Sequence, residues 1–240
     1  MANTGITRTN GTPTLATKCT ISAWVKRCGS NINNSGKDEN IAETYSDDSN
    51  FCFFRFDGND KLNAYSLGIG AFSVTTDAKF KDPNGWYHVV LAIDTTDSTS
   101  TNRVKIYVNG VQQTTSGTQP NQNSNAAFNT SGDTYQIGDS NRYANFEFDV
   151  IMSHYHFVDG LAYQASTFGS TDATTGEWKI KTDVSVSYGT NGFFVFKDGM
   201  NLSGSTVQDQ SGQGNNLTLV GSSVETKDTP SNNFCTLNAS

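Results

Sequence analysis

Charged residues, cysteine, proline and long apolar runs are all scarce in this 240-residue chain. No stretch approaches the ~20 consecutive apolar residues of a membrane-spanning helix, so membrane insertion is not expected. The 16 Lys and Arg are outnumbered by 23 Asp and Glu, which gives a net charge of −7. This balance argues against binding to the phosphates of nucleic acids or to anionic membranes. The first residues lack the basic and apolar segments of a signal peptide, so Sec export is not expected.

The cysteines are few and irregularly spaced, with neither CxxC nor zinc-finger spacing: Cys19, Cys28, Cys52 and Cys235. The first two flank one short predicted strand, so a disulfide between them would have to span the length of that strand. Free, mostly buried thiols are the favoured alternative, and they fit assembly in a reducing cytoplasm.

Aromatic and small polar residues, in contrast, are abundant, with 15 Phe, 9 Tyr and 3 Trp beside many Asn, Thr, Ser and Gly. Aromatic side chains bury large areas, so a sizeable core is expected although 35% of the residues are hydrophobic. The small polar residues favour turns and short strands over long helices. The composition therefore predicts an all-β protein.

The clearest pattern lies between Trp86 and Gly110. Residues 87–94 alternate with apolar groups on both faces, and residues 103–109 alternate with one apolar face. A period of two predicts β-strands, and the polar residues 95–102 predict a solvated loop between them. Asn109-Gly110 supplies the positive φ angles of a tight type I′ turn into a further short strand.

The rest of the chain continues this pattern, with strands predicted over residues 20–27, 41–45, 51–56, 61–67, 72–75, 134–138, 145–158 and 191–196. Residues 114–126 are predicted to form a polar loop, and residues 161–168 one short helical turn. About twelve short strands at this spacing predict a two-sheet antiparallel β-sandwich with one short helix at most. Residues 1–19 are expected to form an N-terminal arm or edge strand, and residues 20–240 a single domain.

Several segments in order resemble the concanavalin A-like lectin/glucanase superfamily in its laminin-G-like form. They are TISAWVKR at 20–27, the hairpin at 86–110, YQIGDS at 135–140 and HFVDG at 156–160. The resemblance covers residues 20–160 and implies a jelly-roll sandwich.

The following segments resemble a variant of this family found in marine bacteriophage virion proteins. They are STFGSTDATTGEWKIK, YGTNGFFVF, DQSGQGNN and DTPSNNFCTLN, so that residues 168–240 form a C-terminal extension. The resemblance implies a virion protein that is assembled in the host cytoplasm: a capsid decoration, a head fibre or a tail-associated module. Its implied partners are capsid or tail proteins of the phage.

Catalysis is the first chemistry to weigh, because glucanases of this superfamily carry carboxylates at alternate strand positions. A retaining mechanism needs two carboxyl groups about 5–5.5 Å apart. Glu147 and Asp149 begin such a pattern, but the third position is Ile151. The chain is therefore predicted not to be an enzyme, with the two carboxylates on a solvated strand face or in a calcium site.

His154 and His156 are two residues apart on one predicted strand, as two zinc ligands might be. No Cys, Asp or Glu at ligand spacing completes a metal site, because the next carboxylate is Asp159. The favoured interpretation is a packed, hydrogen-bonded pair beside aromatic residues.

Calcium is the more credible ion, since laminin-G-like domains often hold one calcium near the sheet rim. The candidate ligands are Asp139, Asn141 and Asp149, which offer hard oxygen atoms. The alternative is a turn in which Asp139 and Asn141 cap their own backbone.

Glycan binding requires an exposed aromatic platform beside amide or carboxylate groups. The candidates are Tyr143, Asn141 and Trp178, whereas Trp86 begins a buried strand and is expected in the core. The resulting hypothesis is a virion surface protein that binds host or environmental glycans. The alternatives are a receptor-binding lectin module of a tail fibre and, less favoured, a glycoside hydrolase.

Overall fold

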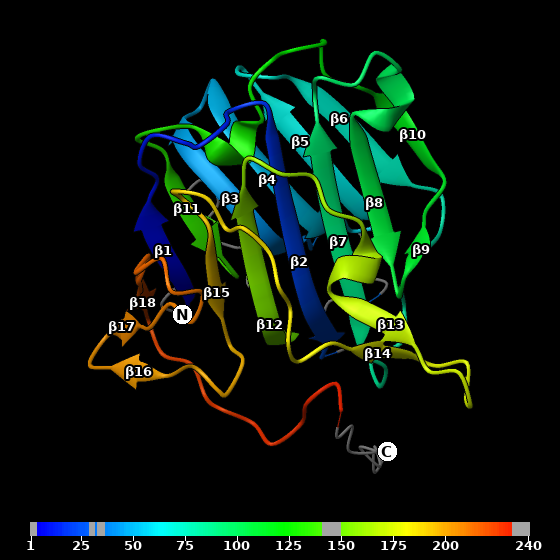
Figure 1. Ribbon diagram of the computed structural model, residues 1–240, viewed down its shortest axis with the longest axis vertical. Helices are drawn as coiled ribbons and strands as arrows, with labels where there is room; N and C mark the ends of the chain where they lie inside the picture. The colour runs from blue at the N-terminus through cyan, green and yellow to red at the C-terminus, as the bar shows by residue number, and fades with distance from the viewer. Residues whose placement is uncertain (1–3, 29–31, 33–36, 141–149, 232–240) are drawn as a thin grey trace.

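A computed structural model describes residues 4–28, 32, 37–140 and 150–231, which fold into two packed antiparallel sheets (Figure 1). One sheet has ten strands and the other has six, and a separate two-stranded hairpin lies beside them. Every strand pair in the two sheets is antiparallel. The predicted all-β sandwich is confirmed. No helix in the described ranges is long and apolar enough to cross a membrane.

The six-stranded sheet lies at the front of Figure 1, in the order β15-β12-β2-β7-β8-β9. Its strands are β2 (Lys18–Arg27), β7 (Tyr87–Asp94), β8 (Val104–Val108), β9 (Val111–Gln112), β12 (Val150–Asp159) and β15 (Phe193–Val195). On β2, Ile21, Ala23 and Val25 enter the core as their alternation predicts, which leaves Ser22, Trp24 and Lys26 on the outer face.

The predicted central hairpin is confirmed as β7 and β8, which pair in register from Val89↔Val108 to Ile93↔Val104. Asn109 and Gly110 have φ angles of 47° and 83°, as the type I′ turn requires. A left-handed φ at two successive residues explains why the turn needs Asn-Gly.

The ten-stranded sheet lies behind it, in the order β10-β6-β5-β4-β3-β11-β1-β18-β17-β16. Its strands are β1 (Gly5–Thr9), β3 (Glu39–Asp47), β4 (Asn50–Phe56), β5 (Leu62–Leu67), β6 (Phe72–Thr76), β10 (Thr115–Thr118), β11 (Thr134–Ile137), β16 (Leu202–Ser203), β17 (Thr206–Val207) and β18 (Leu217–Val220).

Two predictions for this sheet need correction. The first strand, β1, lies inside the sheet between β11 and β18 rather than in an arm or at an edge. The loop expected over residues 114–126 contains β10, which pairs with β6. Both strands consist mainly of polar residues, so neither shows a periodic apolar pattern. Their partners lie far away in sequence, so no local hairpin signal marks them either.

The C-terminal extension is built into both sheets. It supplies β15 to one edge of the front sheet and β16, β17 and β18 to an edge of the back sheet. The β13 (Gly169–Thr171) and β14 (Trp178–Ile180) hairpin lies beside the lower ends of β2 and β7 (Figure 1). Three 3-10 turns, where one helical turn was predicted, make up the helical content of the described residues: η1 (Ser100–Asn102), η2 (Ala127–Asn129) and η3 (Ala165–Thr167).

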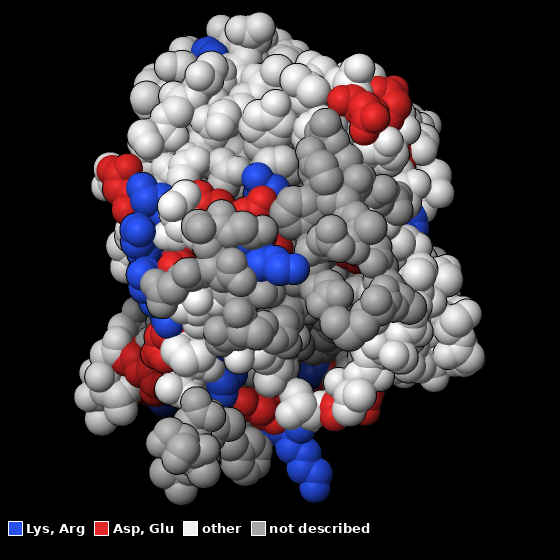
Figure 2. Space-filling view, turned by 180° about the vertical axis from the view of Figure 1, so that it is seen from behind, with Lys and Arg blue, Asp and Glu red and all other residues white. Residues whose placement is uncertain are grey.

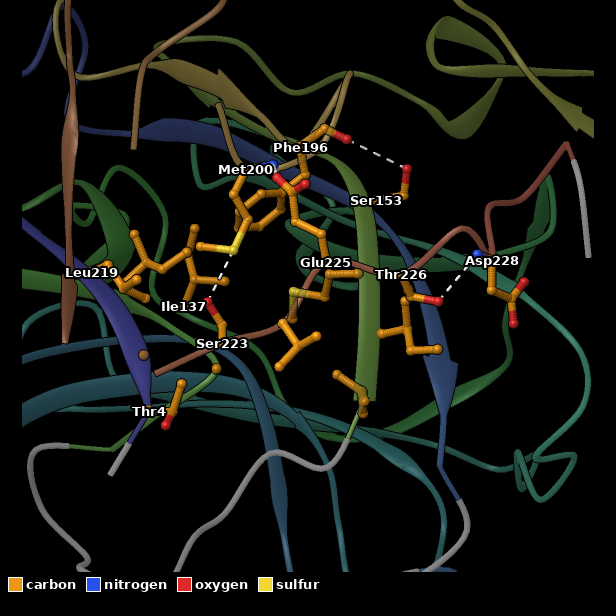
Figure 3. A pocket seen from close by; sticks show the side chains of 18 of the residues that line it. Thr4, Ile137, Ser153, Phe196, Met200, Leu219, Ser223, Glu225, Thr226 and Asp228 are labelled. Carbon is orange, nitrogen blue, oxygen red and sulfur yellow. Dashed lines mark hydrogen bonds between the residues drawn. The ribbon is translucent and has the colours of Figure 1, made fainter. Parts of the chain in front are cut away.

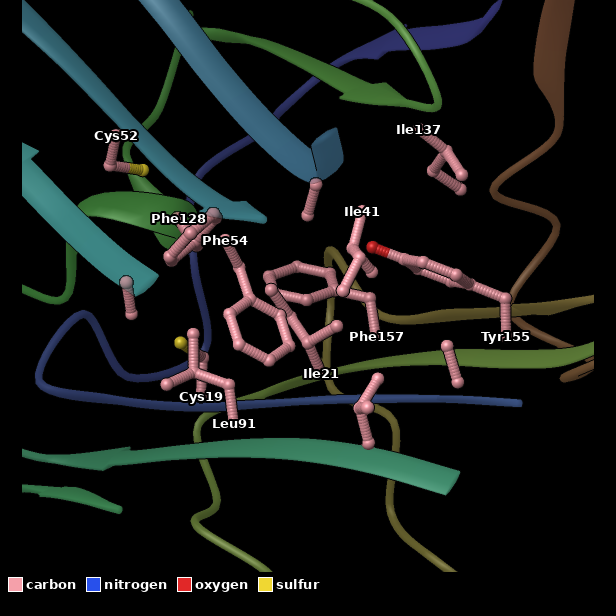
Figure 4. Packing of buried hydrophobic residues seen from close by; sticks show 14 of the residues in the cluster. Cys19, Ile21, Ile41, Cys52, Phe54, Leu91, Phe128, Ile137, Tyr155 and Phe157 are labelled. Atoms are coloured by element: carbon pink, nitrogen blue, oxygen red, sulfur yellow. The ribbon is translucent and has the colours of Figure 1, made fainter. Parts of the chain in front are cut away.

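The core between the sheets is dominated by aromatic and branched side chains (Figure 4). Phe54 and Phe157 come from opposite sheets, and both are fully buried. The hydroxyls of Tyr135 and Tyr155 are 2.8 Å apart, so the two buried phenols satisfy each other. Cys19 and Cys52 are buried thiols in this core, as predicted, Cys28 is exposed, and Cys235 lies outside the described residues.

The buried carboxylate of Asp159, at the end of β12, joins three distant segments of the chain. Its Oδ2 accepts hydrogen bonds from the backbone N–H groups of Thr14 (2.7 Å) and Asn191 (3.0 Å). Its Oδ1 accepts from Asn129 Nδ2 at 2.6 Å and from the backbone N–H of Leu15 at 3.4 Å. A carboxylate is the one side-chain group that accepts at all of these positions, so this residue fixes the N-terminal segment, η2 and the extension together.

The Asp159→Asn substitution is expected to lower the free energy of unfolding by ~2–3 kcal/mol. The amide nitrogen of asparagine would face at least one of these N–H donors and leave it without an acceptor. Urea unfolding followed by far-UV circular dichroism would measure the loss, with the m-value unchanged. Asp47→Asn is the matched control, because Asp47 also accepts a backbone N–H, that of Ser49 at 2.8 Å, but in an exposed turn. An equal loss in both variants would contradict the role assigned to Asp159.

Candidate functional site: a cavity at the end of the sandwich

A cavity of about 330 Å³ opens at the end of the sandwich where the described chain begins, with Thr4, Gly5 and Ile6 in its lining (Figure 3). This volume lies within the range of small-ligand pockets. Its walls come from both sheets and from the C-terminal extension. The apolar wall includes Ile6, Ile137, Val150, Met152, Phe196, Met200 and Leu219, and the polar and charged side chains are those of Thr4, Ser153, Lys197, Ser223, Glu225, Thr226, Asp228 and Thr229.

A backbone irregularity forms one side of the cavity. The register of β12 against β2 shifts between Ser153 and His156, and His154 has a φ of 47°. Directly opposite, Phe196 follows β15 with a φ of 66°, and its carbonyl accepts the N–H of His154 at 3.1 Å. A left-handed φ is unusual for a bulky residue and costs ~1–3 kcal/mol, and such strain concentrates at functional sites.

The mouth of the cavity is formed by residues 223–229, which two acidic residues fasten to the fold. Glu225 accepts the backbone N–H of Met200 at 2.8 Å. Asp228 forms a buried ion pair with Lys26 (2.6 Å) through Oδ2, and its Oδ1 accepts Trp86 Nε1–H at 3.1 Å. The extension therefore reaches across the outer face of β2, and Trp86 is a buried anchor, as predicted.

The two carboxylates differ in what they can offer a ligand. Both carboxylate oxygens of Asp228 accept hydrogen bonds. Of the two Glu225 oxygens, only Oε1 accepts a hydrogen bond from a described residue. The Thr226 hydroxyl accepts the N–H of Asp228 at 3.2 Å and keeps its own proton for donation. The mouth thus offers a ligand the carboxylate acceptor of Glu225 and the hydroxyl donor of Thr226, beside an apolar wall (Figure 3).

Several of the site residues predicted from the sequence are neighbours, along the chain, of residues that line this cavity. Asp139 directly follows Ile137 and Gly138, which line the cavity, and Val150 lines it where the chain is described again. Asn141, Tyr143, Glu147 and Asp149 lie outside the described residues. Their predicted roles in glycan or calcium binding stay predictions.

Asp139 itself supplies little of a calcium site. Its side chain is buried, and its Oδ1 accepts the N–H of Ser140 at 2.7 Å, as in the predicted capping turn. Burial raises the pKa of this carboxyl above its ordinary value. Calcium takes six to eight oxygen ligands, and within the described part of the chain no cluster of three His, Cys, Asp or Glu residues could hold a metal ion.

Trp178, the third predicted glycan residue, packs against the outer face of the front sheet. Its ring stacks on His88 with centroids 5.9 Å apart, and its Nε1–H donates to His88 Nδ1 at 3.0 Å. Glycine is required at 110 and 169, because a Cβ there would lie 2.4 and 2.6 Å from the indole. With one ring face and its only polar atom engaged, Trp178 anchors the β13–β14 hairpin, and its contact with a glycan stays a prediction.

These contacts determine the tautomer of His88. Because Trp178 Nε1 can only donate, Nδ1 of His88 is the acceptor and Nε2 carries the proton, which it donates to Ser22 Oγ at 2.9 Å. Burial lowers the pKa of His88 to about 3. The imidazole is therefore neutral in the folded protein.

The two histidines of β12 are packed and hydrogen-bonded, as predicted, and both rings lie against Phe194. His154 Nδ1 lies 2.8 Å from Ser153 Oγ, and burial lowers the His154 pKa to about 4. His156 Nδ1 lies 2.8 Å from the hydroxyl of Tyr188, and its ring stacks on Phe194 at a centroid distance of 4.0 Å.

The outer face of the back sheet carries a second group of polar and aromatic side chains (Figure 2). Phe53 and Tyr65 stack with centroids 5.1 Å apart, and the guanidinium of Arg55 lies 3.7 Å from the centre of the Phe53 ring. Arg55 also pairs with Asp38 at 2.7 Å. Basic and acidic side chains lie next to one another on this face, rather than in a patch of one sign.

Sequence reasoning missed the residues that complete the cavity. Phe196 was predicted only as the end of a strand, and Met200, Glu225 and Thr226 lie in the extension, where no motif marks them. Glu225 lies between a valine and a threonine, close to Lys227 and Asp228, so its only signal is a charged residue in a polar segment. That signal does not indicate a cavity.

The comparisons with known proteins agree with this fold. The family model described as the concanavalin A-like lectin/glucanases superfamily, of the laminin G type, matches residues 2–160. The chain therefore belongs to that superfamily, which contains both lectins and glucanases. Among curated protein sequences, none matches this chain.

Three solved structures illustrate the likeness in fold. Domain 4 of AbnA, a GH43 extracellular arabinanase from Geobacillus stearothermophilus in complex with arabinotriose, is 17% identical with a TM-score of 0.48, covering 66% of this chain and 68% of that one. The LG1-3 region of the laminin alpha2 chain is 11% identical with a TM-score of 0.43. The match covers 65% of this chain and 30% of the laminin chain. A botulinum neurotoxin type C structure is 14% identical with a TM-score of 0.34. The match covers 59% of this chain and 31% of the toxin chain. The chain thus spans about a third of the laminin and toxin chains. All three similarities are distant, so no function follows from them.

Acidification is expected to destabilise the protein through His88. Its folded-state pKa of about 3 lies below the unfolded value, so the unfolded state binds more protons between pH 6.5 and 3. Stability is therefore highest above pH 6.5 and falls as the pH drops, by ~2 kcal/mol from this residue between pH 7 and 5. Urea unfolding of wild type and His88→Gln at both pH values would isolate this contribution, since the variant should lose that much less on acidification. An identical loss in the two proteins would contradict the neutral, buried assignment.

Proposed function

We propose that this protein is a lectin-like, non-catalytic protein of the bacteriophage virion surface that binds host or environmental glycans. The observation that carries the glycan part is the cavity at the end of the sandwich. Sugars combine apolar C–H faces with hydroxyl groups, and the cavity combines the Phe196 and Met200 side chains with Glu225 and several hydroxyls. Membership of a superfamily that contains lectins supports the same proposal.

The non-catalytic part of the proposal is supported by the state of the carboxylates. Glycoside hydrolysis needs two carboxyl groups facing one bond, one of them able to exchange a proton. Glu225 and Asp228 are the carboxylates among the residues that line the cavity. Asp228 is held by Lys26 and Trp86, so it could act only if the extension were released.

The virion part rests on the resemblance of the extension to marine bacteriophage virion proteins. The segments that carry this resemblance lie in residues 168–240, and the described strands of this extension belong to both sheets. Capsid decoration, a head fibre and a tail-associated position all remain consistent with this proposal. A receptor-binding lectin module of a tail fibre is the alternative, and it would use the same cavity.

Glycan binding is expected to depend on the cavity mouth. Val224 lines the mouth and is 93% exposed, so Val224→Trp should cover the entrance without disturbing the core. Binding on a glycan array should fall by about tenfold or more, the equivalent of ~1.4 kcal/mol. Val111→Trp is the matched control, because Val111 is 63% exposed on β9, at the opposite edge of the front sheet.

Each array is run with calcium and with a chelator, which also tests the proposal that Asp139, Asn141 and Asp149 hold calcium. Loss of binding in the chelator would support that proposal. Background binding by the wild type in both conditions would contradict the glycan function.

The virion assignment predicts that the polypeptide copurifies with infectious particles. Mass spectrometry of gradient-purified virions from the phage that encodes this chain should detect it at a stoichiometry comparable to a known structural protein. Immunogold electron microscopy would then place it on the head or on the tail. Its presence in the infected-cell lysate but absence from purified virions would contradict the proposal.

A further inference from the structure

The cavity is divided into an apolar interior and a polar mouth. Ile6, Ile137 and Met200 are buried members of the main core cluster, and the other apolar wall residues pack against that cluster. Residues 223–227, in contrast, are exposed. A ligand that fills the cavity must therefore carry an apolar group at one end and polar groups at the other.

An unsubstituted hexose does not meet this requirement. Its hydroxyls surround the edge of the ring, so a ring inserted into the interior would bring hydroxyls against the apolar wall, where they would lose their hydrogen bonds to water. A sugar with an acylamino substituent does meet it, because the acyl chain is apolar and the amide beside it supplies one donor and one acceptor.

Resting on the proposed glycan function, we infer that the cavity recognises N-acylated amino sugars, with the acyl group in the interior and the ring at the mouth. The Glu225 carboxylate accepts the amide N–H through the oxygen that Met200 does not use. The Thr226 hydroxyl donates its proton to the amide carbonyl.

The length of the acyl group gives the sharpest test. The probes are the methyl glycosides of glucose, N-acetylglucosamine and its N-propanoyl and N-butanoyl homologues, titrated into the full chain by NMR. Affinity should rise at least tenfold from glucose to the N-acetyl sugar. It should then rise about fourfold for each added methylene that the cavity accommodates. Saturation-transfer spectra should show the strongest transfer to the acyl protons.

Matched variants test the polar contacts. Glu225→Gln keeps an acceptor for the N–H of Met200 but turns an amide N–H₂ toward the ligand, so affinity for the N-acetyl sugar should fall about tenfold. Thr226→Val should give a smaller loss, and Glu177→Gln, at an exposed glutamate beside β14, should give none. The dependence on acyl length should persist in all three variants.

The outcomes separate this inference from the proposed function. Equal affinity for glucose and its N-acyl derivatives, or no dependence on acyl length, would overturn the inference. If the array then shows binding to unacylated glycans that Val224→Trp abolishes, the glycan function stands without it. If no glycan binds and the probes give no saturation transfer, both fall.

Discussion

The carboxylate of Asp159 is the interaction on which the arrangement of the whole chain depends. It accepts hydrogen bonds from backbone or side-chain groups of Thr14, Asn129 and Asn191, and no cation neutralises it among the described residues. A buried charge without a counter-ion is tolerated only where donors surround it. The three segments must therefore be in place together, which couples the N-terminal segment around Thr14, the η2 turn and the C-terminal extension. These contacts tie the extension to the rest of the sandwich.

Near the start of β12, a buried ion pair fixes the course of the extension. Lys26 lies on the outer face of β2, and its ion pair with Asp228 holds the last described segment against the front sheet. Burial of two charges is costly unless their remaining hydrogen bonds are satisfied, and Trp86 supplies one of these to Asp228. Between this anchor and the contact of Glu225 with Met200, the chain crosses the open end of the sandwich and becomes the mouth of the cavity.

Local patterns predicted the strands whose partners are close in sequence. The hairpin β7–β8 and its Asn109-Gly110 turn follow from a period of two and from the φ angles that Asn and Gly tolerate. The polar strands β1 and β10 were not predicted, because their place in the sheet depends on strands contributed by distant parts of the chain. The same limit applies to the site. Asp139 was named as a candidate because acidic turns are visible in sequence, whereas the cavity beside it exists only once five segments of the chain have packed together.

The bulge in β12 explains why a cavity lies there at all. β15 pairs with β12 over Tyr155–Phe157, and at Phe196 the chain turns left-handed and departs. Among the described residues, Val150–Ser153 then have a strand neighbour on one side only. Continued regular pairing would have filled this space with backbone. The strain at His154 and Phe196 is instead offset by the stacking of His156 on Phe194 and by the contact of His156 with the Tyr188 hydroxyl. The opening is therefore a property of how the extension leaves the sheet, so any ligand that binds there contacts the extension as well as the superfamily fold.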